Sequence, residues 1–167
     1  MSGEMDQKLF LEAYDNHADA IFRHCFFRVF SREKAQDLTQ ETFTKSWEYI
    51  SRGGEIKNIR AFLYKVASNL IIDESRKKRA LSLDALMEEG FDFGTDERGK
   101  LEDIISAKEA LVLMEKLDDS YKEVVLLRYV EDLSPKEIAE ILGETENMVS
   151  VRIHRGVKKI KELIKNV

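Results

Sequence analysis

Apolar residues recur every three or four positions through most of the chain, a spacing that places their side chains on one face of a helix. The first such stretch runs from Leu9 to Phe30, and the second runs from Arg32 to Ile50 with Ser31 placed to cap it. A third stretch runs from Ile59 to Arg79. The sequence has no window of sustained strand-like alternation, so the pattern predicts an all-α fold that begins with three helices.

The C-terminal part of the chain holds the sharpest helix signals. Two amphipathic stretches (104–117 and 120–131) precede a capping box at Ser134-Pro135-Lys136-Glu137, in which proline stands at the first helical position. Gly143 allows a corner after this helix, and Thr145 can cap the next one. These signals predict a helix-turn-helix at the end of the chain. The predicted inward stripe of its second helix consists of Val149, Ile153, Val157, Ile160 and Ile164.

Charge is unevenly distributed, although the net charge of the whole chain is only -5. Residues 58–80 carry six bases and two acids, and residues 143–167 carry six bases and three acids. Residues 81–103 carry eight acids, two bases and three of the eight glycines, and their helical periodicity is broken. We therefore expect an acidic flexible linker at 81–103 that joins two small helical domains, residues 1–80 and 104–167.

Composition narrows the class of protein. The 167 residues are 43% hydrophobic and 35% charged, which suits compact cores under a strongly ionised surface. Cys25 is the only cysteine and cannot form an internal disulfide, and the N-terminus does not read as a signal peptide. No run approaches the roughly 20 apolar residues that span a bilayer. We expect a cytoplasmic protein with no membrane insertion.

Catalytic chemistry has little support in the sequence. His17, His24 and Cys25 could suggest a metal site, but His17 and Cys25 are eight positions apart and no second ligand pair follows. P-loop, nucleophile-elbow and paired-carboxylate signals are also absent. We expect structural roles for these three residues, and we expect no enzyme, no cofactor and no bound metal.

The polar face of the third predicted helix has the composition of a single-stranded DNA contact. Cations bind phosphates, whereas aromatic and amide groups stack on unpaired bases and hydrogen-bond to them. The basic end of this helix has an alternative role, because cations there also complement the helix dipole. The candidate DNA contacts on this helix are Arg60, Tyr64, Lys65, Asn69, Arg76 and Lys77.

The last helix is the candidate reader of double-stranded DNA. In a helix-turn-helix the second helix enters the major groove, where its N-terminal half contacts base edges. Arg155 can donate two hydrogen bonds to guanine, Asn147 can pair with adenine, and Val151 can touch a thymine methyl group. A helical hairpin that contacts protein is the alternative. The candidate DNA contacts are Asn147, Ser150, Val151, Arg152, His154, Arg155 and Lys158, the last of which suits phosphate.

Three segments, in this order, resemble the extracytoplasmic-function (ECF) group of bacterial RNA polymerase sigma factors. They read DLTQETFTKSWE, FLYKVASNLIIDESRKKR and YKEVVLLRYVEDLSPKEIAEILGETENMVSVRIHR, and they span most of the chain. The resemblance implies a region 2-like domain at 1–80, the linker at 81–103 and a region 4-like helix-turn-helix domain at 104–167. It also implies that the protein binds core RNA polymerase and directs promoter-specific transcription initiation.

The resemblance changes the interpretation of the second predicted helix, whose polar face would otherwise read as a solvated surface. It implies that this helix binds the clamp helices of the polymerase β′ subunit and that the C-terminal domain meets the β flap. The implied polymerase-binding residues are Asp37, Gln40, Glu41 and Phe43. The loop at 51–58 and the third helix are implied to capture the minus-10 element, with Asn69 at a base-contacting position, and the last helix to read the minus-35 element. An anti-sigma factor is the further partner that we expect.

Four positions depart from the pattern of the group. Met148, Ser150 and Val151 stand where members often carry threonine, a cation and serine, and Gly156 stands at a common alanine. These departures predict an individual minus-35 preference, anchored by Arg152 and Arg155. Two alternatives stay open at this point. A polymerase-independent helix-turn-helix regulator leaves the DLTQETF face without a role, and a helical adaptor predicts no dependence on DNA.

Overall fold

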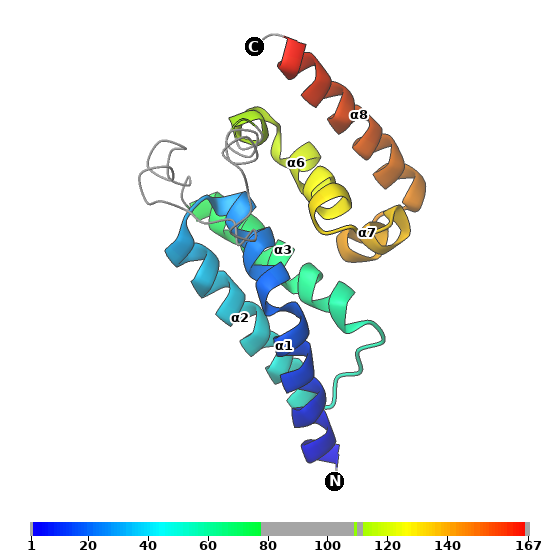
Figure 1. Ribbon diagram of the computed structural model, residues 1–167. Helices are drawn as coiled ribbons and strands as arrows, with labels where there is room; N and C mark the ends of the chain where they lie inside the picture. Colours follow the sequence, from blue (N-terminus) through cyan, green and yellow to red (C-terminus); the bar gives the residue numbers. More distant parts are fainter. Residues whose placement is uncertain (1, 78–108, 110–111, 166–167) are drawn as a thin grey trace, which may run out of the picture.

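Figure 1 shows the computed structural model, which describes residues 2–77, 109 and 112–165. Every element within these ranges is a helix, so the prediction of an all-α fold is confirmed. The N-terminal lobe contains α1 (Ser2–Val29), α2 (Arg32–Ser51) and α3 (Ile59–Lys77). The C-terminal lobe contains α6 (Asp119–Val125), the π-helix η1 (Leu126–Val130), α7 (Pro135–Leu142) and α8 (Glu146–Lys165). The predicted linker at 81–103 lies outside the described residues.

The N-terminal lobe is a packed group of three helices. Phe30 has a φ of 50°, a left-handed conformation that ends α1 and reverses the chain into α2. Ser31 caps α2 as predicted, because its hydroxyl accepts a hydrogen bond from the Lys34 N–H at 3.3 Å. The apolar stripes of the helices meet at residues such as Ile21 and Leu63, which are both fully buried. The predicted limits of α2 and the start of α3 agree with the observed ones to within one residue, whereas α1 begins at Ser2, seven residues before the predicted start at Leu9.

The helix-turn-helix forms through the predicted caps. The Ser134 hydroxyl accepts from the Glu137 N–H at 3.2 Å, and Gly143 leaves α7 with a φ of 68°. Thr145 accepts from the Met148 N–H at 3.2 Å at the start of α8. One position of the predicted inward stripe is wrong, because Ile164 is 56% exposed. It lies in the last turn of α8, which ends at Lys165.

The predicted helix at 120–131 is not one regular helix. Its second half widens into the π-turns of η1, where the Glu131 N–H reaches back five residues to the Leu126 carbonyl at 3.0 Å. Asp132 follows with a φ of 55° and turns the chain towards α7. The wide turn and the reversal together place Glu131 at the end of the helix, where it faces the N-terminal lobe.

The two lobes pack against one another in one continuous apolar core. The core cluster includes Ile21 and Leu63 from the N-terminal lobe together with Leu127, Leu133 and Ile138 from the C-terminal lobe. The lobes meet where α3 contacts α7 and where α1 contacts η1. Figure 1 shows α7 beside α3, with α8 on the far side of α7 and α6. The sequence predicted two lobes, and the structure adds their mutual packing.

Candidate functional site

The C-terminal end of α2 is shaped by two glycines. Gly53 adopts a φ of 87° and donates to the Ile50 carbonyl at 3.0 Å, while Gly54 donates to the Tyr49 carbonyl at 2.9 Å. This pair of bonds is a Schellman motif, which closes the helix and turns the chain away from it. A Cβ atom on Gly54 would lie 2.4 Å from the Tyr49 ring, so a larger residue there would displace this ring. The predicted loop at 51–58 therefore starts from a fixed, close-packed corner.

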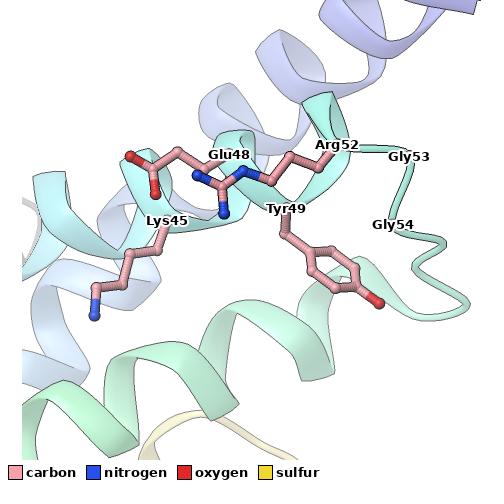
Figure 2. Close-up of a pocket in the computed structure, with 6 residues that line it drawn as sticks. All are labelled: Lys45, Glu48, Tyr49, Arg52, Gly53 and Gly54. Carbon is pink, nitrogen blue, oxygen red and sulfur yellow. The ribbon is translucent and has the colours of Figure 1, made fainter.

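A hollow of about 420 Å³ opens at this corner, and Figure 2 shows the residues that line it. The Tyr49 ring projects below the glycines, while the Arg52 guanidinium extends back along α2 towards Lys45 and Glu48. Tyr49 packs on the Phe62 ring of α3, with 5.0 Å between centroids, and is still 44% exposed. An exposed aromatic face beside two cations suits an unpaired base and its phosphate.

The polar face of α2 is open to solvent. Asp37, Gln40 and Glu41 are all exposed, and the Lys45 ammonium lies 3.9 Å from the Glu41 carboxylate. Phe43 points the other way and is only 3% exposed, because its ring packs against Phe10 and Tyr14 of α1. The face therefore presents three of the four predicted polymerase-binding residues, and Phe43 belongs to the core beneath them.

The polar face of α3 is only partly open. Lys65 and Asn69 are exposed, as predicted. The expectation that Tyr64 points outwards is wrong, because Tyr64 is 1% exposed and its hydroxyl donates to the Glu131 carboxylate at 2.7 Å. Arg60 donates to the Glu131 carbonyl, also at 2.7 Å. The C-terminal lobe covers this side of the helix. Of Arg76 and Lys77, the structure describes only the helical backbone.

Helix α8 presents most of its predicted DNA contacts to solvent, and Arg152 is the exception. The exposed members are Asn147, Ser150, Val151, His154, Arg155 and Lys158. The Arg152 side chain is 22% exposed and pairs with the carboxylate of Glu144, in the turn before α8. Arg152 and Arg155 both line a groove of about 400 Å³ between α6 and α8, together with Asn147. Of the two arginines, Arg155 is the exposed one, whereas the guanidinium of Arg152 is paired with Glu144.

Gly156 lies where α8 packs closely on α6. A Cβ atom at this position would lie 2.9 Å from the Val125 Cγ2 atom of α6. The absence of a side chain therefore lets α8 lie nearer to α6 than an alanine would allow. Gly156 is one of the four positions at which the sequence departs from the pattern of the group, and this close packing is what the departure allows.

His24 and Cys25 are buried in the N-terminal core. Burial, with nearby Arg28 as a smaller cause, lowers the pKa of His24 to about 3, and burial raises the pKa of the Cys25 thiol to about 12. Their neutral forms are strongly favoured, which fits structural roles. Within the described ranges, no three residues of the metal-binding types come together as a metal site. In the same part of the chain, no helix has the length and apolar character needed to cross a bilayer.

Three contributors to this architecture have no clear signal in the sequence. Glu131 and Arg23 read as exposed helix residues, yet they join the lobes through a buried carboxylate. Glu144 reads as a turn residue, yet it engages Arg152. An acidic residue directly after an apolar helix run is the only hint that Glu131 offered, and many surface acids share that context.

Two family models match the chain in the order of its lobes. The model for sigma-70 region 2 matches residues 13–81, and the model for sigma-70 region 4 matches residues 107–160. The ECF RNA polymerase sigma factor SigW of Bacillus subtilis is 29% identical, over 97% of this chain and 92% of its own length.

Solved structures with the same fold include two complexes. The sigma factor RpoE of Bartonella quintana, bound to the anti-sigma factor NepR, gives a TM-score of 0.73 at 20% identity, with 95% of this chain and 98% of that chain covered. CnrH, bound to the cytosolic domain of CnrY, gives a TM-score of 0.74 at 20% identity. The match covers 99% of this chain and 95% of that chain. At this identity the two structures support the fold, which they share over nearly the whole chain.

Proposed function

We propose separate roles for the two lobes of this chain, which belongs to the extracytoplasmic-function (ECF) group of RNA polymerase sigma factors. It binds core RNA polymerase and directs promoter-specific transcription initiation. The region 2 match covers most of the N-terminal lobe (13–81) and the region 4 match covers most of the C-terminal lobe (107–160), which supports domain limits near 1–80 and 104–167. A polymerase-independent regulator is not favoured, because it leaves the region 2 match unexplained.

The α2 face binds the clamp helices of the β′ subunit through Asp37, Gln40 and Glu41. Support comes from their exposure on one side of a helix whose other side is anchored by buried Phe43. A rigid helix that presents polar groups in fixed positions suits a specific protein contact. The C-terminal lobe adds a second contact, on the β flap, so that two modest contacts on one polymerase reinforce each other.

The minus-10 element is bound by the corner at the end of α2 and by α3. The hollow beside Tyr49 and Arg52 offers an aromatic face and positive charge to an unpaired base. Lys65 and Asn69 continue the same surface along α3, where a cation and an amide suit the phosphates and bases of a single strand. Arg60, Tyr64, Arg76 and Lys77 complete the proposed set on this helix.

The minus-35 element is read by α8 in the major groove. Arg155 and Asn147 are the base-reading candidates, because both are exposed in the N-terminal half of the helix. Arg152 is redirected by Glu144 and sets the position of the helix relative to its turn. The other proposed contacts are Ser150, Val151 and His154 on the reading edge and Lys158 on phosphate.

Sigma factors are transcription initiation factors and not enzymes. We extend this to the chain itself: it performs no covalent chemistry and needs no cofactor, because the polymerase carries out nucleotidyl transfer. It acts in the cytoplasm, where its polymerase is found. An anti-sigma factor holds it inactive, a proposal supported by the NepR complex of a sigma factor with the same fold.

The test is binding to core RNA polymerase, followed by run-off transcription on genomic fragments. Asp37→Ala combined with Gln40→Ala should abolish association, because the pair sits at the centre of the proposed contact. Gln7→Ala combined with Asp15→Ala is the matched control, since it removes the same two side-chain types from exposed positions on α1. Equal polymerase binding by the two double variants would contradict the assignment of α2.

A further inference from the structure

Two large apolar side chains are open to solvent near the start of α8. Met148 is 53% exposed and Val151 is 41% exposed. The residues around them on this side of the helix are polar and also exposed, namely Asn147, Ser150 and Arg155. Met148 and Val151 therefore form an apolar patch on a face that otherwise presents hydrogen-bonding groups and positive charge. We call these two residues the apolar pair.

The apolar pair forms one continuous surface. Residues three positions apart on a helix have Cβ atoms about 5 to 6 Å from one another, which is the case for Met148 and Val151. Both side chains line the groove of about 400 Å³ between α6 and α8. Tyr121 of α6 lines the same groove, and so do Asn147 and Arg155. A ligand in this groove would meet the apolar pair and its polar neighbours together.

The start of α8 holds the apolar pair in place. The Met148 N–H donates to the Thr145 hydroxyl at 3.2 Å, and Val149 anchors the same turn because it is fully buried. A valine in a helix has one strongly preferred rotamer, so the methyl groups of Val151 keep a fixed direction. Methionine is flexible and polarisable, so Met148 can adjust to whatever the valine contacts. The pair thus combines a rigid contact with an adaptable one.

The chemistry of the apolar pair selects one group among those that bases present in the major groove. Most of these groups are hydrogen-bond donors or acceptors, and the C5-methyl group of thymine is the apolar one. Neither Met148 nor Val151 has a side-chain donor. A polar base edge placed against them would lose its water without gaining a hydrogen bond. The pair therefore favours a thymine methyl group at the positions that it covers.

The spacing of the apolar pair limits which thymines it can meet. Successive bases along a strand are about 3.4 Å apart, so the roughly 5 to 6 Å between the two Cβ atoms spans between one and two such steps. Two thymines on neighbouring base pairs fit this spacing, and so do two thymines with one base pair between them. Arg155 lies one turn beyond Val151 and can contact a guanine next to them.

We propose that Met148 and Val151 form a site for the methyl groups of two thymines in the minus-35 element. The proposal rests on the proposed role of α8 in the major groove and names the bases that this helix prefers. The exposed cations Arg155 and Lys158 on the same helix favour DNA as the occupant, because they attract phosphate and would repel a basic or purely apolar partner. Lysine on phosphate supplies affinity, whereas the apolar pair supplies a choice of base.

Deoxyuridine tests the methyl contact directly, because it pairs as thymidine does and lacks only the C5-methyl group. The probe is a promoter duplex recovered by run-off transcription, in which each thymine of the minus-35 element is replaced in turn. The complex of core polymerase with the full-length protein should bind about fourfold more weakly after replacement at each of two thymines. Competition between labelled and unlabelled duplexes measures this loss at one fixed salt concentration, since the phosphate contacts depend on salt.

Variants of the apolar pair distinguish a methyl contact from an effect on DNA shape. Deoxyuridine also alters the deformability of the duplex, and this effect does not depend on the side chain that faces it. In Val151→Ser and in Met148→Ser, replacement of the corresponding thymine should no longer weaken binding. Ile164→Ser is the matched control, because it removes another exposed apolar side chain from α8. This control should keep the fourfold loss at both thymines.

The outcomes separate the thymine site from the proposed function. Promoter-specific transcription without any effect of deoxyuridine in the minus-35 element would overturn the site and leave the role of α8 standing. A loss that persists in both serine variants would assign the effect to DNA shape, which also overturns the site. Loss of core polymerase binding in these variants would assign the apolar pair to a protein partner instead. Wild-type protein that directs no promoter-specific transcription would overturn the proposed function together with the site.

Discussion

Helices α3 and α8 are both assigned to DNA, but the free protein leaves them accessible to very different degrees. On α8, Asn147 and Arg155 are exposed. On α3, Tyr64 is buried and Arg60 is bound to the opposite lobe. Both helices carry a basic polar face and an apolar stripe. The difference therefore comes from what packs around each helix.

The position of each helix in the fold explains this difference. The long helix α8 packs its apolar stripe on α6 and α7 and keeps its other side free for a ligand. By contrast, α3 contacts α1 and α2 on its apolar side and α7 on part of its polar side. The comparison teaches that a polar helix face predicted to meet a ligand can serve an internal contact instead. Single substitutions can test this difference between the two helices.

The largest effect is expected at Tyr64, the covered residue of α3. Tyr64→Ala should lower the free energy of unfolding by about 3 to 5 kcal/mol, because it removes a fully buried ring and a hydrogen bond to Glu131. Urea unfolding followed by circular dichroism measures the change. Asn69→Ala, five residues further on the exposed face, should alter stability by less than about 0.5 kcal/mol. Similar losses in both variants would contradict the division of α3 into a covered and an open side.

The two arginines of α8, Arg152 and Arg155, should also differ in what their substitution changes. Arg155→Ala should weaken promoter binding of the polymerase complex by about 1 to 3 kcal/mol, because it removes an exposed arginine that we propose contacts a base. Arg152→Ala should mainly lower the free energy of unfolding, by about 1 to 3 kcal/mol, since Glu144 loses its charged partner. Promoter titrations and urea unfolding on both variants measure the two quantities. A large stability loss in Arg155→Ala with none in Arg152→Ala would reverse the assignment.

These contrasts show which features a single sequence could predict. Caps such as Ser134 and Thr145 were predictable because they act on backbone groups three residues away. The lobe contact was not predictable, because Arg23 and Glu131 are 108 positions apart and neither departs from the pattern of a surface residue. The predicted outward direction of the Tyr64 side chain was wrong for the same reason, since its hydrogen-bond partner lies in the other lobe. The exposure of Arg155 could be predicted from the apolar stripe of α8, which faces the other way. The pairing of Arg152 with Glu144 could not, because it depends on the geometry of the turn before α8.

Acidic pH should loosen the support beneath α3. His24 packs edge-on against Tyr64 and lies 3.4 Å from the Ser68 hydroxyl, and burial lowers its pKa to about 3. Because the folded pKa lies below the unfolded value, the stability contribution of neutral His24 is present above pH 6.5 and is lost as pH falls towards 3. The free energy of unfolding should fall by about 1.4 kcal/mol per pH unit below 6.5 on account of this residue. Urea titrations at about pH 7 to 5, the range in which histidine titrates, measure the slope of the unfolding free energy against pH. This slope should be shallower in His24→Gln than in the wild-type protein, and equal slopes would contradict this account.

The smallest effect is expected where α8 meets α6, at Gly156. Alanine is favoured over glycine inside a helix by about 1 kcal/mol, but the new Cβ atom would lie 2.9 Å from the stiff, β-branched side chain of Val125. These opposing contributions are similar in size, so Gly156→Ala alone should destabilise the protein by less than about 1 kcal/mol. In a Val125→Ala background the obstructing methyl group is gone, and the same substitution should stabilise the protein by about 1 kcal/mol. A double-mutant cycle by urea unfolding isolates this coupling. An identical effect of Gly156→Ala in both backgrounds would show that the glycine does not set the distance between the reading helix and its support.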